Sequence, residues 1–320
     1  MTRDSGTLTE LPAMRCTDAA RMRGEPLQAS AVRYSRFLLL EVPGPWGCSA
    51  LEGKHMEAGV GRRLASAAAA AGTHVLLIRR PGRHPSAGSD ARHGSMAWGL
   101  ADTSAGAERV QWGAWRDPAE LLDLDLTAAV PQPANVRGGP QRLALVCTNG
   151  KRDQCCAVRG RPVAAALAAA TSWDTWECSH LGGHRFAATI MLLPTGDMFG
   201  WLDPESALEV ARRFDAGQLM LSHYRGRCGQ PAPVQAALHA AAVRLGDPHR
   251  GAIRPSWARR LTPDGDRWEV RVVHQAGHGP GTGYRLVVAA SELAPAFLSC
   301  GDGARKTEVH YETLSFSPVS

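Results

Sequence analysis

The predicted order of strands and helices occurs twice along this 320-residue chain, which restricts the fold to the mixed α/β class. Each half runs strand, long loop, helix, strand, loop, hairpin, helix, because short apolar runs alternate with helix-period patterns. The segments of the first half are 36–42, 57–71, 74–78, 96–101, 109–115 and a short helix from Asp117-Pro118. Those of the second half are 143–146, 161–170, 175–178, 188–193, 198–203 and a helix from Pro204. The shared order predicts a degenerate internal repeat, although unrelated α/β halves also acquire such an order by chance.

A segment rich in proline and glycine, residues 127–140, separates the two halves and predicts a linker. The expected division is an irregular segment (1–31), an α/β domain (32–126), the linker, a second α/β domain (141–225) and an extension (226–320). The extension is predicted to contain a helix at 231–245 and a hairpin of strands 267–273 and 284–290. We therefore expect a small α+β unit at the C-terminal end.

The net charge of the chain is modest, since 36 Lys and Arg residues against 30 Asp and Glu residues leave +6. Because the charges are scattered rather than gathered in blocks, they do not favour nucleic-acid binding, and they suit an acidic protein partner. No apolar run approaches the roughly 20 residues of a membrane span. The first residues also lack the apolar core of a secretory signal, so we expect a cytoplasmic protein without a membrane segment.

Four of the eight cysteines fall close together, between residues 147 and 178. In a reducing compartment, such clustering indicates metal or redox chemistry more often than disulfides. We expect Cys178 to be packed inside its strand. The cysteines outside the cluster have no partner at metal-ligand spacing and are expected to be structural; they are Cys16, Cys48, Cys228 and Cys300.

The residues with the clearest chemistry follow two neighbouring predicted strands. Cys147 ends one strand and Cys156 ends the loop after it, while His180 and His184 follow the next strand. Because the ends of parallel strands meet at one edge of a sheet, these four side chains are expected to converge. The Gly182-Gly183 pair between the histidines lets the backbone turn tightly near a bulky centre.

Two thiolates and two imidazoles can bind a tetrahedral zinc ion or a [2Fe–2S] cluster. Structural zinc sites usually have a gap of about two to four residues between the first two cysteines, whereas eight residues separate Cys147 from Cys156. The longer gap favours the wider iron–sulfur cluster, and zinc remains the alternative. A thiol-redox protein using Cys155-Cys156 or Cys178 is a third hypothesis, although no Cys-x-x-Cys motif stands at a predicted helix start.

The pattern Cys147-x₈-Cys156 followed by His180-x-Gly-Gly-His184 resembles the sucrase/ferredoxin-like family. The resemblance extends to 38–47, 176–180 and 185–188, and it covers roughly residues 15–225. It implies a thioredoxin-like ferredoxin domain in the second half, preceded by a site-less α/β domain. It also implies a [2Fe–2S] cluster whose ligands are Cys147, Cys156, His180 and His184, with Cys156 preferred over its neighbour Cys155. Asn149 stands where many relatives have histidine, at a position that is not a ligand.

These observations predict an electron-transfer protein rather than an enzyme. A cluster with two neutral imidazole ligands bears less negative charge than one held by four thiolates, which raises its reduction potential. Basic residues flank the predicted ligands and either steer an acidic redox partner or form a solvated face; they are Lys151, Arg152, Arg159, Arg161 and Arg185. The sequence shows no pair of carboxylates in a glycosidase context, so the sucrase half of the family name has no support.

Overall fold

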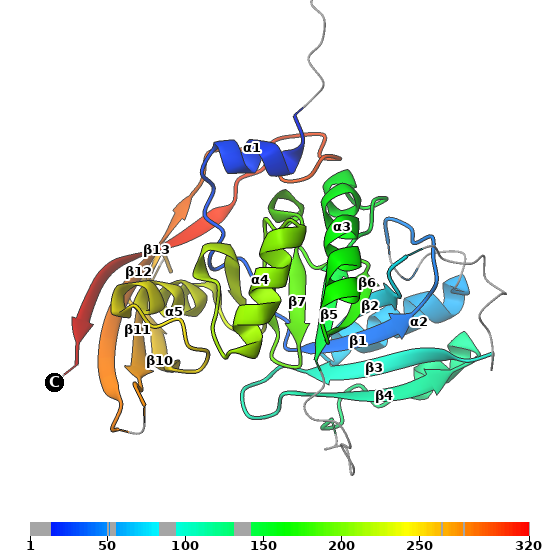
Figure 1. Ribbon diagram of the computed structural model, residues 1–320, viewed down its shortest axis with the longest axis horizontal. Coiled ribbons are helices and arrows are strands. Elements are labelled where there is room, and N and C mark those ends of the chain that lie inside the picture. The colour runs from blue at the N-terminus through cyan, green and yellow to red at the C-terminus, as the bar shows by residue number, and fades with distance from the viewer. Residues whose placement is uncertain are drawn as a thin grey trace, which may run out of the picture.

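The computed structural model of the chain describes residues 14–49, 51, 56–82, 94–130, 142–263, 265–277 and 279–319. Most of the predicted linker at 127–140 and the first thirteen residues lie outside these ranges. Figure 1 shows a large sheet with helices packed on it, and a smaller curved sheet beside it at the C-terminal end. In the part of the chain that the structure describes, no helix combines the length and the apolar character needed to cross a membrane.

The large sheet has nine strands in the order β4-β3-β1-β2-β6-β5-β7-β8-β9. The strands of the first half are β1 (Arg36–Glu41), β2 (Thr73–Arg79), β3 (Met96–Asp102) and β4 (Arg109–Trp115). Those of the second half are β5 (Leu143–Cys147), β6 (Asp174–Cys178), β7 (Ile190–Leu193), β8 (Asp197–Phe199) and β9 (Tyr224–Arg227). In each half the first two strands are parallel, and the third pairs antiparallel with the first. Counted outward from the junction of β2 and β6, the strands of the two halves therefore follow the same order, which is β2-β1-β3-β4 in the first half and β6-β5-β7-β8 in the second.

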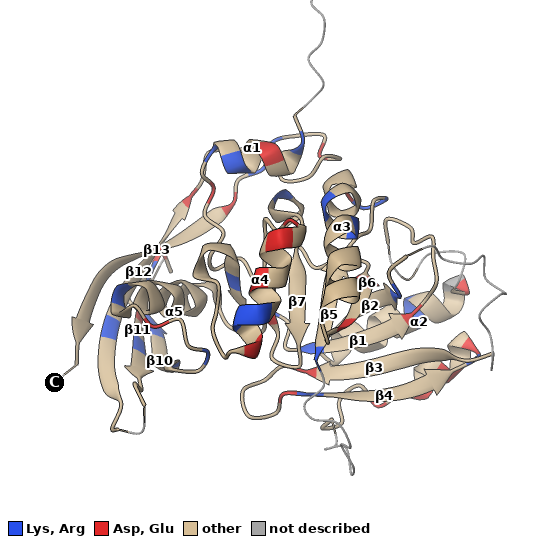
Figure 2. Cartoon of the chain, in the orientation of Figure 1, with Lys and Arg blue, Asp and Glu red and all other residues tan. Residues whose placement is uncertain are grey.

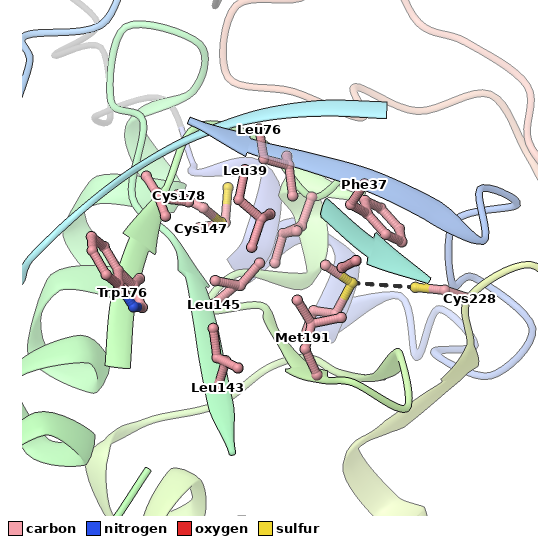
Figure 3. Close-up of a cluster of buried hydrophobic side chains, with 14 of the residues drawn as sticks. Phe37, Leu39, Leu76, Leu143, Leu145, Cys147, Trp176, Cys178, Met191 and Cys228 are labelled. Atoms are coloured by element: carbon pink, nitrogen blue, oxygen red, sulfur yellow. Dashed lines mark hydrogen bonds between the residues drawn. The ribbon is translucent and has the colours of Figure 1, made fainter. Parts of the chain in front are cut away.

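The junction between β2 and β6 is short, with the pairs Ile78↔Cys178 and Arg79↔Glu177 in antiparallel register. A buried ion pair joins the same strands, since Arg79 Nη2 lies 2.7 Å from Glu177 Oε2. Apolar side chains from both halves pack together beside this junction, as Figure 3 shows for residues of β1, β2, β5 and β7. The two halves consequently share a hydrophobic core as well as a sheet.

The helices that belong to the large sheet are α2 (Ala58–Ala70), α3 (Gln154–Ala170) and α4 (Pro204–Asp215), whereas α5 (Ala232–Leu245) packs on strands of the smaller sheet. The chain also forms the 3₁₀ turns η2 (Pro118–Asp123), η3 (His184–Phe186) and η4 (Leu221–His223). The predicted helix starts at Asp117-Pro118 and at Pro204 are confirmed, and the Asp117 and Asp203 carboxylates each accept a backbone N–H hydrogen bond there as N-caps.

The predicted start of the helix at residue 161 is wrong, because α3 begins at Gln154. Asp153 is its N-cap, and its side chain accepts a hydrogen bond of 2.8 Å from the backbone N–H of Cys155. Pro162, which suggested a first helical position, lies instead in the helix interior. Cys155 and Cys156 therefore occupy the first helical turn rather than the end of a loop.

The termini contribute a short helix and a second sheet. Helix α1 spans Cys16–Met22, within the segment predicted to be irregular. The second sheet has the order β10 (Ile253–Arg260), β11 (Arg267–His274), β12 (Thr282–Glu292) and β13 (Val309–Pro318). The predicted hairpin is confirmed as β11 and β12, while the outer strands β10 and β13 were not predicted. In Figure 1, α1 lies against the segment between β12 and β13.

Candidate metal centre

The two histidines of the motif lie at the two ends of a tight turn after β6, with His180 in the loop and His184 as the first residue of η3. Gly182 and Gly183 adopt left-handed backbone conformations, with φ of +73° and +69°. A Cβ on Gly183 would lie 2.7 Å from Nη2 of Arg225, so a larger residue does not fit. This turn brings the imidazoles of His180 and His184 into a stack, with ring centroids 4.3 Å apart and an interplanar angle of 19°.

The two cysteines of the motif face each other from a strand and the helix that covers it. Cys147 is the last residue of β5, Cys156 lies in the first turn of α3, and both are buried. Helix and strand approach closely here, because a Cβ on Gly160 would lie 2.2 Å from the carbonyl oxygen of Cys147. The two thiols are close enough for Cys156 to lower the pKa of Cys147, and Cys147 Sγ lies 3.9 Å from the Ser179 carbonyl oxygen.

The four predicted ligands form a ring in which each cysteine lies beside one histidine. Cys156 Sγ is 3.3 Å from His184 Nδ1, and His180 is close enough to Cys147 to lower the pKa of its thiol. We call Cys147, Cys156, His180 and His184 the central group. Among the described residues, no set of His, Cys, Asp or Glu side chains whose ligand atoms all lie within 4.8 Å of one another contains these four together. At least two of their ligand atoms are therefore more than 4.8 Å apart.

The protonation states of three members of the central group suit metal binding, whereas Cys147 and burial raise the pKa of Cys156, which must lose its proton to bind a metal. The hydrogen bond from Cys156 lowers the pKa of Cys147 well below that of an ordinary thiol, and the adjacent His180 acts in the same direction, which favours a thiolate. Burial and the neighbouring His180 lower the pKa of His184 to about 4, so its imidazole is neutral at pH 7. His180 Nδ1 is buried and has no hydrogen-bond partner among the described residues, which leaves its lone pair or N–H unused.

A buried arginine supports the histidine loop, and the sequence analysis missed it. Arg225 Nη1 donates a 3.0 Å hydrogen bond to the Gly182 carbonyl, and Nε donates one of 2.9 Å to Ser30 Oγ. Burial and the nearby Arg185 lower the pKa of Arg225 to about 10, and it remains a cation at pH 7. A fully buried positive charge beside two cysteines offsets the negative charge of a thiolate centre. No local motif marks Arg225, because it lies on β9, far from the ligands in sequence.

The loop after β1 supports the turn that precedes α3. Asn149 Nδ2 donates a 3.0 Å hydrogen bond to the Gly47 carbonyl, and its Oδ1 accepts one of 3.1 Å from the Lys151 N–H. The Trp46 ring in the same loop lies under the Arg79 guanidinium, 4.2 Å from centroid to Cζ. The Pro-Gly-Pro-Trp-Gly segment of the first half therefore positions the cysteine-bearing turn of the second half.

Residues 27–226 of the chain match the sucrase/ferredoxin-like family, and this range contains the whole central group. The chain belongs to the sucrase/ferredoxin-like family. The resemblance seen in the sequence is thereby confirmed. Comparisons with curated proteins and with solved structures find no match.

This sucrase/ferredoxin-like chain has buried Cys, His and Asp side chains that can hold a metal ion. Asp153, Cys156 and His184 have ligand atoms within 4.8 Å of one another. The Asp153 carboxylate, whose role at the site the sequence did not indicate, thus lies beside the central group. Burial alone would raise the pKa of Asp153, but hydrogen bonds from Ser299 and from backbone N–H groups outweigh it and lower the pKa.

The remaining cysteines of this family member divide into packed residues and a second group. Cys178 and Cys228 lie in the core, where Cys228 Sγ contacts Met191 Sδ at 3.4 Å (Figure 3). The expectation that Cys16 and Cys300 have no partner is wrong, because both lie beside Cys155 and Asp153. We call Cys16, Asp153, Cys155 and Cys300 the terminal group. Sequence spacing missed it because its members are far apart in the chain.

The basic residues near the motif do not form one solvent-exposed face. Arg185 is buried and pairs with Glu25, and the exposed Arg159 pairs with Asp18 at 2.7 Å. Lys151, Arg152 and Arg161 are exposed. Figure 2 shows Lys and Arg interspersed with Asp and Glu over the elements of both sheets.

Proposed function

We propose that this protein carries one electron on a [2Fe–2S] cluster held by Cys147, Cys156, His180 and His184. The observation that supports this most is the donor set gathered after β5 and β6, which is two buried cysteines and two stacked histidines with Cys156 Sγ 3.3 Å from His184 Nδ1. Two cysteines and two histidines are the ligands of the [2Fe–2S] cluster in Rieske centres. Because a two-iron cluster separates its cysteine pair from its histidine pair, the Cys156 and His184 side chains must move apart to admit it.

The side chains fit such a cluster chemically. A thiolate at Cys147, a neutral imidazole at His184 and the unpartnered Nδ1 of His180 supply donor atoms without a large protonation cost. When bound, a [2Fe–2S] cluster accepts and releases a single electron. Buried Arg225 favours the negatively charged reduced form, because it lies close to both cysteines.

The ligand set predicts the range of the reduction potential. Replacing two thiolates by imidazoles changes the potential from about −400 mV in plant-type ferredoxins to about −150 to +300 mV in Rieske centres. A buried arginine shifts the value further upward, because it stabilises added negative charge. We expect this protein to lie within the Rieske range.

The second half is the thioredoxin-like ferredoxin domain of this proposal, and the first half is its site-less counterpart. In support, β5, α3 and β6 form a parallel strand–helix–strand unit, and an antiparallel hairpin and a helix follow. The first half has the same strand order, with Cys48 as its lone cysteine.

The redox partner in this proposal is an acidic protein. In support, Lys151 and Arg152 just before α3 and Arg161 within it are exposed, and Val158 of α3 has 51% of its surface exposed. Complementary charge mainly raises the association rate of a transient complex.

A zinc protein is the second candidate function, because one observation favours a single ion. Asp153, Cys156 and His184 lie within 4.8 Å of one another, which matches the ligand spacing of one metal ion. In that case the central group would be structural and would carry no electron.

The decisive experiment is anaerobic purification from cells supplied with iron and zinc, followed by metal analysis, visible absorption and EPR of the reduced protein. We expect a red-brown protein with about two irons per chain and a rhombic EPR signal of low average g. His184→Ala should abolish or shift the signal.

The matched control is His249→Ala, since this imidazole is mostly exposed on the surface and bonds only with Asp247 and Gln218. It should leave metal content and spectrum unchanged. A colourless protein with zinc that disappears in His184→Ala would establish the second candidate instead. A protein with no metal at the central group would contradict both.

A further inference from the structure

The terminal group places three thiols and a carboxylate around one point. The three sulfur–sulfur distances are 3.3 Å for Cys155 to Cys300, and 3.5 Å for Cys16 to both Cys155 and Cys300. The oxygens of Asp153 lie 3.8 and 4.0 Å from Cys16 Sγ. All four residues have ligand atoms within 4.8 Å of one another.

These side chains come from three separate parts of the chain. Cys16 is in α1, Cys155 is in the first turn of α3, and Cys300 is in the irregular segment between β12 and β13. The backbone is held to bring them together, because Asp153 Oδ2 accepts hydrogen bonds from Ser299 Oγ at 2.7 Å and from the Cys300 N–H at 2.8 Å. The Cys300 thiol thus faces the start of α3 through specific contacts.

The spacing matches the ligands of a single metal ion. Zinc–sulfur bonds of about 2.3 Å place the sulfurs of a tetrahedral site about 3.8 Å apart. The three thiols need to separate by only a few tenths of an ångström to reach that distance. An iron–sulfur cluster, whose ligands bind different irons, needs a wider arrangement.

Packing alone provides little reason for the three thiols to meet. Cys16 and Cys155 belong to an apolar cluster that has Ala187 as its third member among the described residues, and Cys300 lies outside it. Helix α1 has seven residues, and no regular strand or helix holds the segment around Cys300. A cross-link at this point would fasten both terminal segments to α3, as structural metal sites do in small units with little core.

We infer that Cys16, Cys155 and Cys300 form a second metal site, which binds a thiophilic divalent cation such as Zn²⁺, with Asp153 beside them. Three thiolates and one oxygen ligand satisfy the tetrahedral preference of zinc. The site differs from the central group, and the inference does not depend on iron being bound there.

Asp153 either completes the tetrahedron or orients the thiols from outside it. Its oxygens already accept hydrogen bonds from Cys155 N–H, Cys300 N–H and Ser299 Oγ. A carboxylate oxygen has further lone pairs, so these bonds do not prevent metal binding. Binding of Zn²⁺ releases the remaining thiol protons to solvent, and no electron is transferred. Cys300 is exposed, so the ion can enter from this side.

The test counts metals per chain in protein purified from cells supplied with iron and zinc. We expect about one zinc ion that is lost in Cys300→Ser, while the iron content stays unchanged. Cys48→Ser is the matched control, because Cys48 is an exposed thiol outside both groups. Zinc lost only in Cys156→Ser would place it in the central group and overturn the inference, as would equal zinc in Cys300→Ser and the unsubstituted protein.

A second measurement uses the unsubstituted protein and does not depend on how a variant folds. The rate of alkylation at each cysteine is followed by mass spectrometry, with and without a zinc chelator. We expect Cys300 to be protected until the chelator is added, and Cys48 to react equally in both samples. A Cys300 rate that the chelator does not change, a protein without zinc, or a disulfide between two of the three thiols would overturn the inference.

Discussion

Cys155 and Cys156 are consecutive residues in the first turn of α3, and each belongs to a different group of ligand-type side chains. Cys156 meets partners that all lie between residues 147 and 184. Cys155 meets Cys16 and Cys300, which are 139 and 145 residues away. The comparison shows that one helical turn can connect a site made by local sequence with a site made only by the tertiary fold.

The two groups also differ in what surrounds them. Cys147 and Cys156 belong to the large core cluster that joins both halves of the sheet. Cys16 and Cys155 belong to a cluster of three residues. Packing therefore preforms the central group, whereas the terminal group relies on hydrogen bonds to Asp153 and on the metal that we infer.

The adjacent cysteines offer the sharpest test of this comparison and the largest expected effect. Cys156→Ser should remove the visible colour and the iron, because it deletes a ligand of the central group. Cys155→Ser should keep the colour and lose zinc. Metal analysis and visible absorption of the two variants, purified side by side, measure both effects. If Cys155→Ser also loses its colour, Cys155 is a cluster ligand and the division into two groups is wrong.

The buried pair of Glu25 and Arg185 provides the next largest effect. Glu25 lies in the segment after α1, and Arg185 follows His184 directly; both side chains are almost fully buried. Glu25→Gln leaves Arg185 only its longer pair with the more exposed Glu308, at 3.5 Å, so we expect a loss of about 3 kcal/mol in the free energy of unfolding. Urea unfolding of the metal-free protein measures it.

A matched control for this substitution is Glu209→Gln, at an exposed pair on α4. It should leave the urea midpoint nearly unchanged, because exposed ion pairs contribute little. Equal effects of the two substitutions would show that the segment after α1 is not held by Arg185. The terminal group would then be its main attachment.

Asp153→Asn tests whether the two groups are coupled. The amide keeps one oxygen acceptor but loses the other, so either the Cys155 N–H or the Ser299 and Cys300 donors lose their partner. We expect a loss of about 1–3 kcal/mol in stability and a fall of about 10- to 100-fold in zinc affinity. Zinc titration in competition with a chelator measures the affinity. An unchanged affinity would show that Asp153 acts only as a helix cap.

Glycine substitutions in α2 and α3 give the smallest effects and compare the two halves. Gly160→Ala should cost about 1–3 kcal/mol, because the new Cβ meets the Cys147 carbonyl oxygen and pushes α3 away from the central group. Gly59→Ala in α2, where nothing lies within 4 Å of a Cβ, should stabilise the protein by roughly 0.5 kcal/mol. Thermal unfolding of both variants shows whether the signs differ as expected.

The strands and helices with strong apolar patterns could be predicted from the sequence. The apolar run at 36–42 forms β1, and the helix-period pattern at 231–245 forms α5. The start of α3 could not, because Pro162 is typical of a first helical position but lies in the helix interior, and the N-cap is Asp153. Strands β10 and β13 were missed because few of their side chains are buried, and pairing with β11 and β12 holds them.

The sequence by itself determined the α/β class, the family and the central group. These depend on the periodicity of apolar residues, on the spacing Cys147-x₈-Cys156 and on the Gly-Gly turn between two histidines. All three are features of short stretches of the sequence. Only the tertiary structure decided which distant side chains meet. Arg225 lies under the histidine loop because β9 is added at the sheet edge, and Cys16 and Cys300 reach Cys155 because the terminal segments cross at the start of α3. Contacts between residues hundreds of positions apart depend on how elements pack, and no pattern in the chain encodes their spacing.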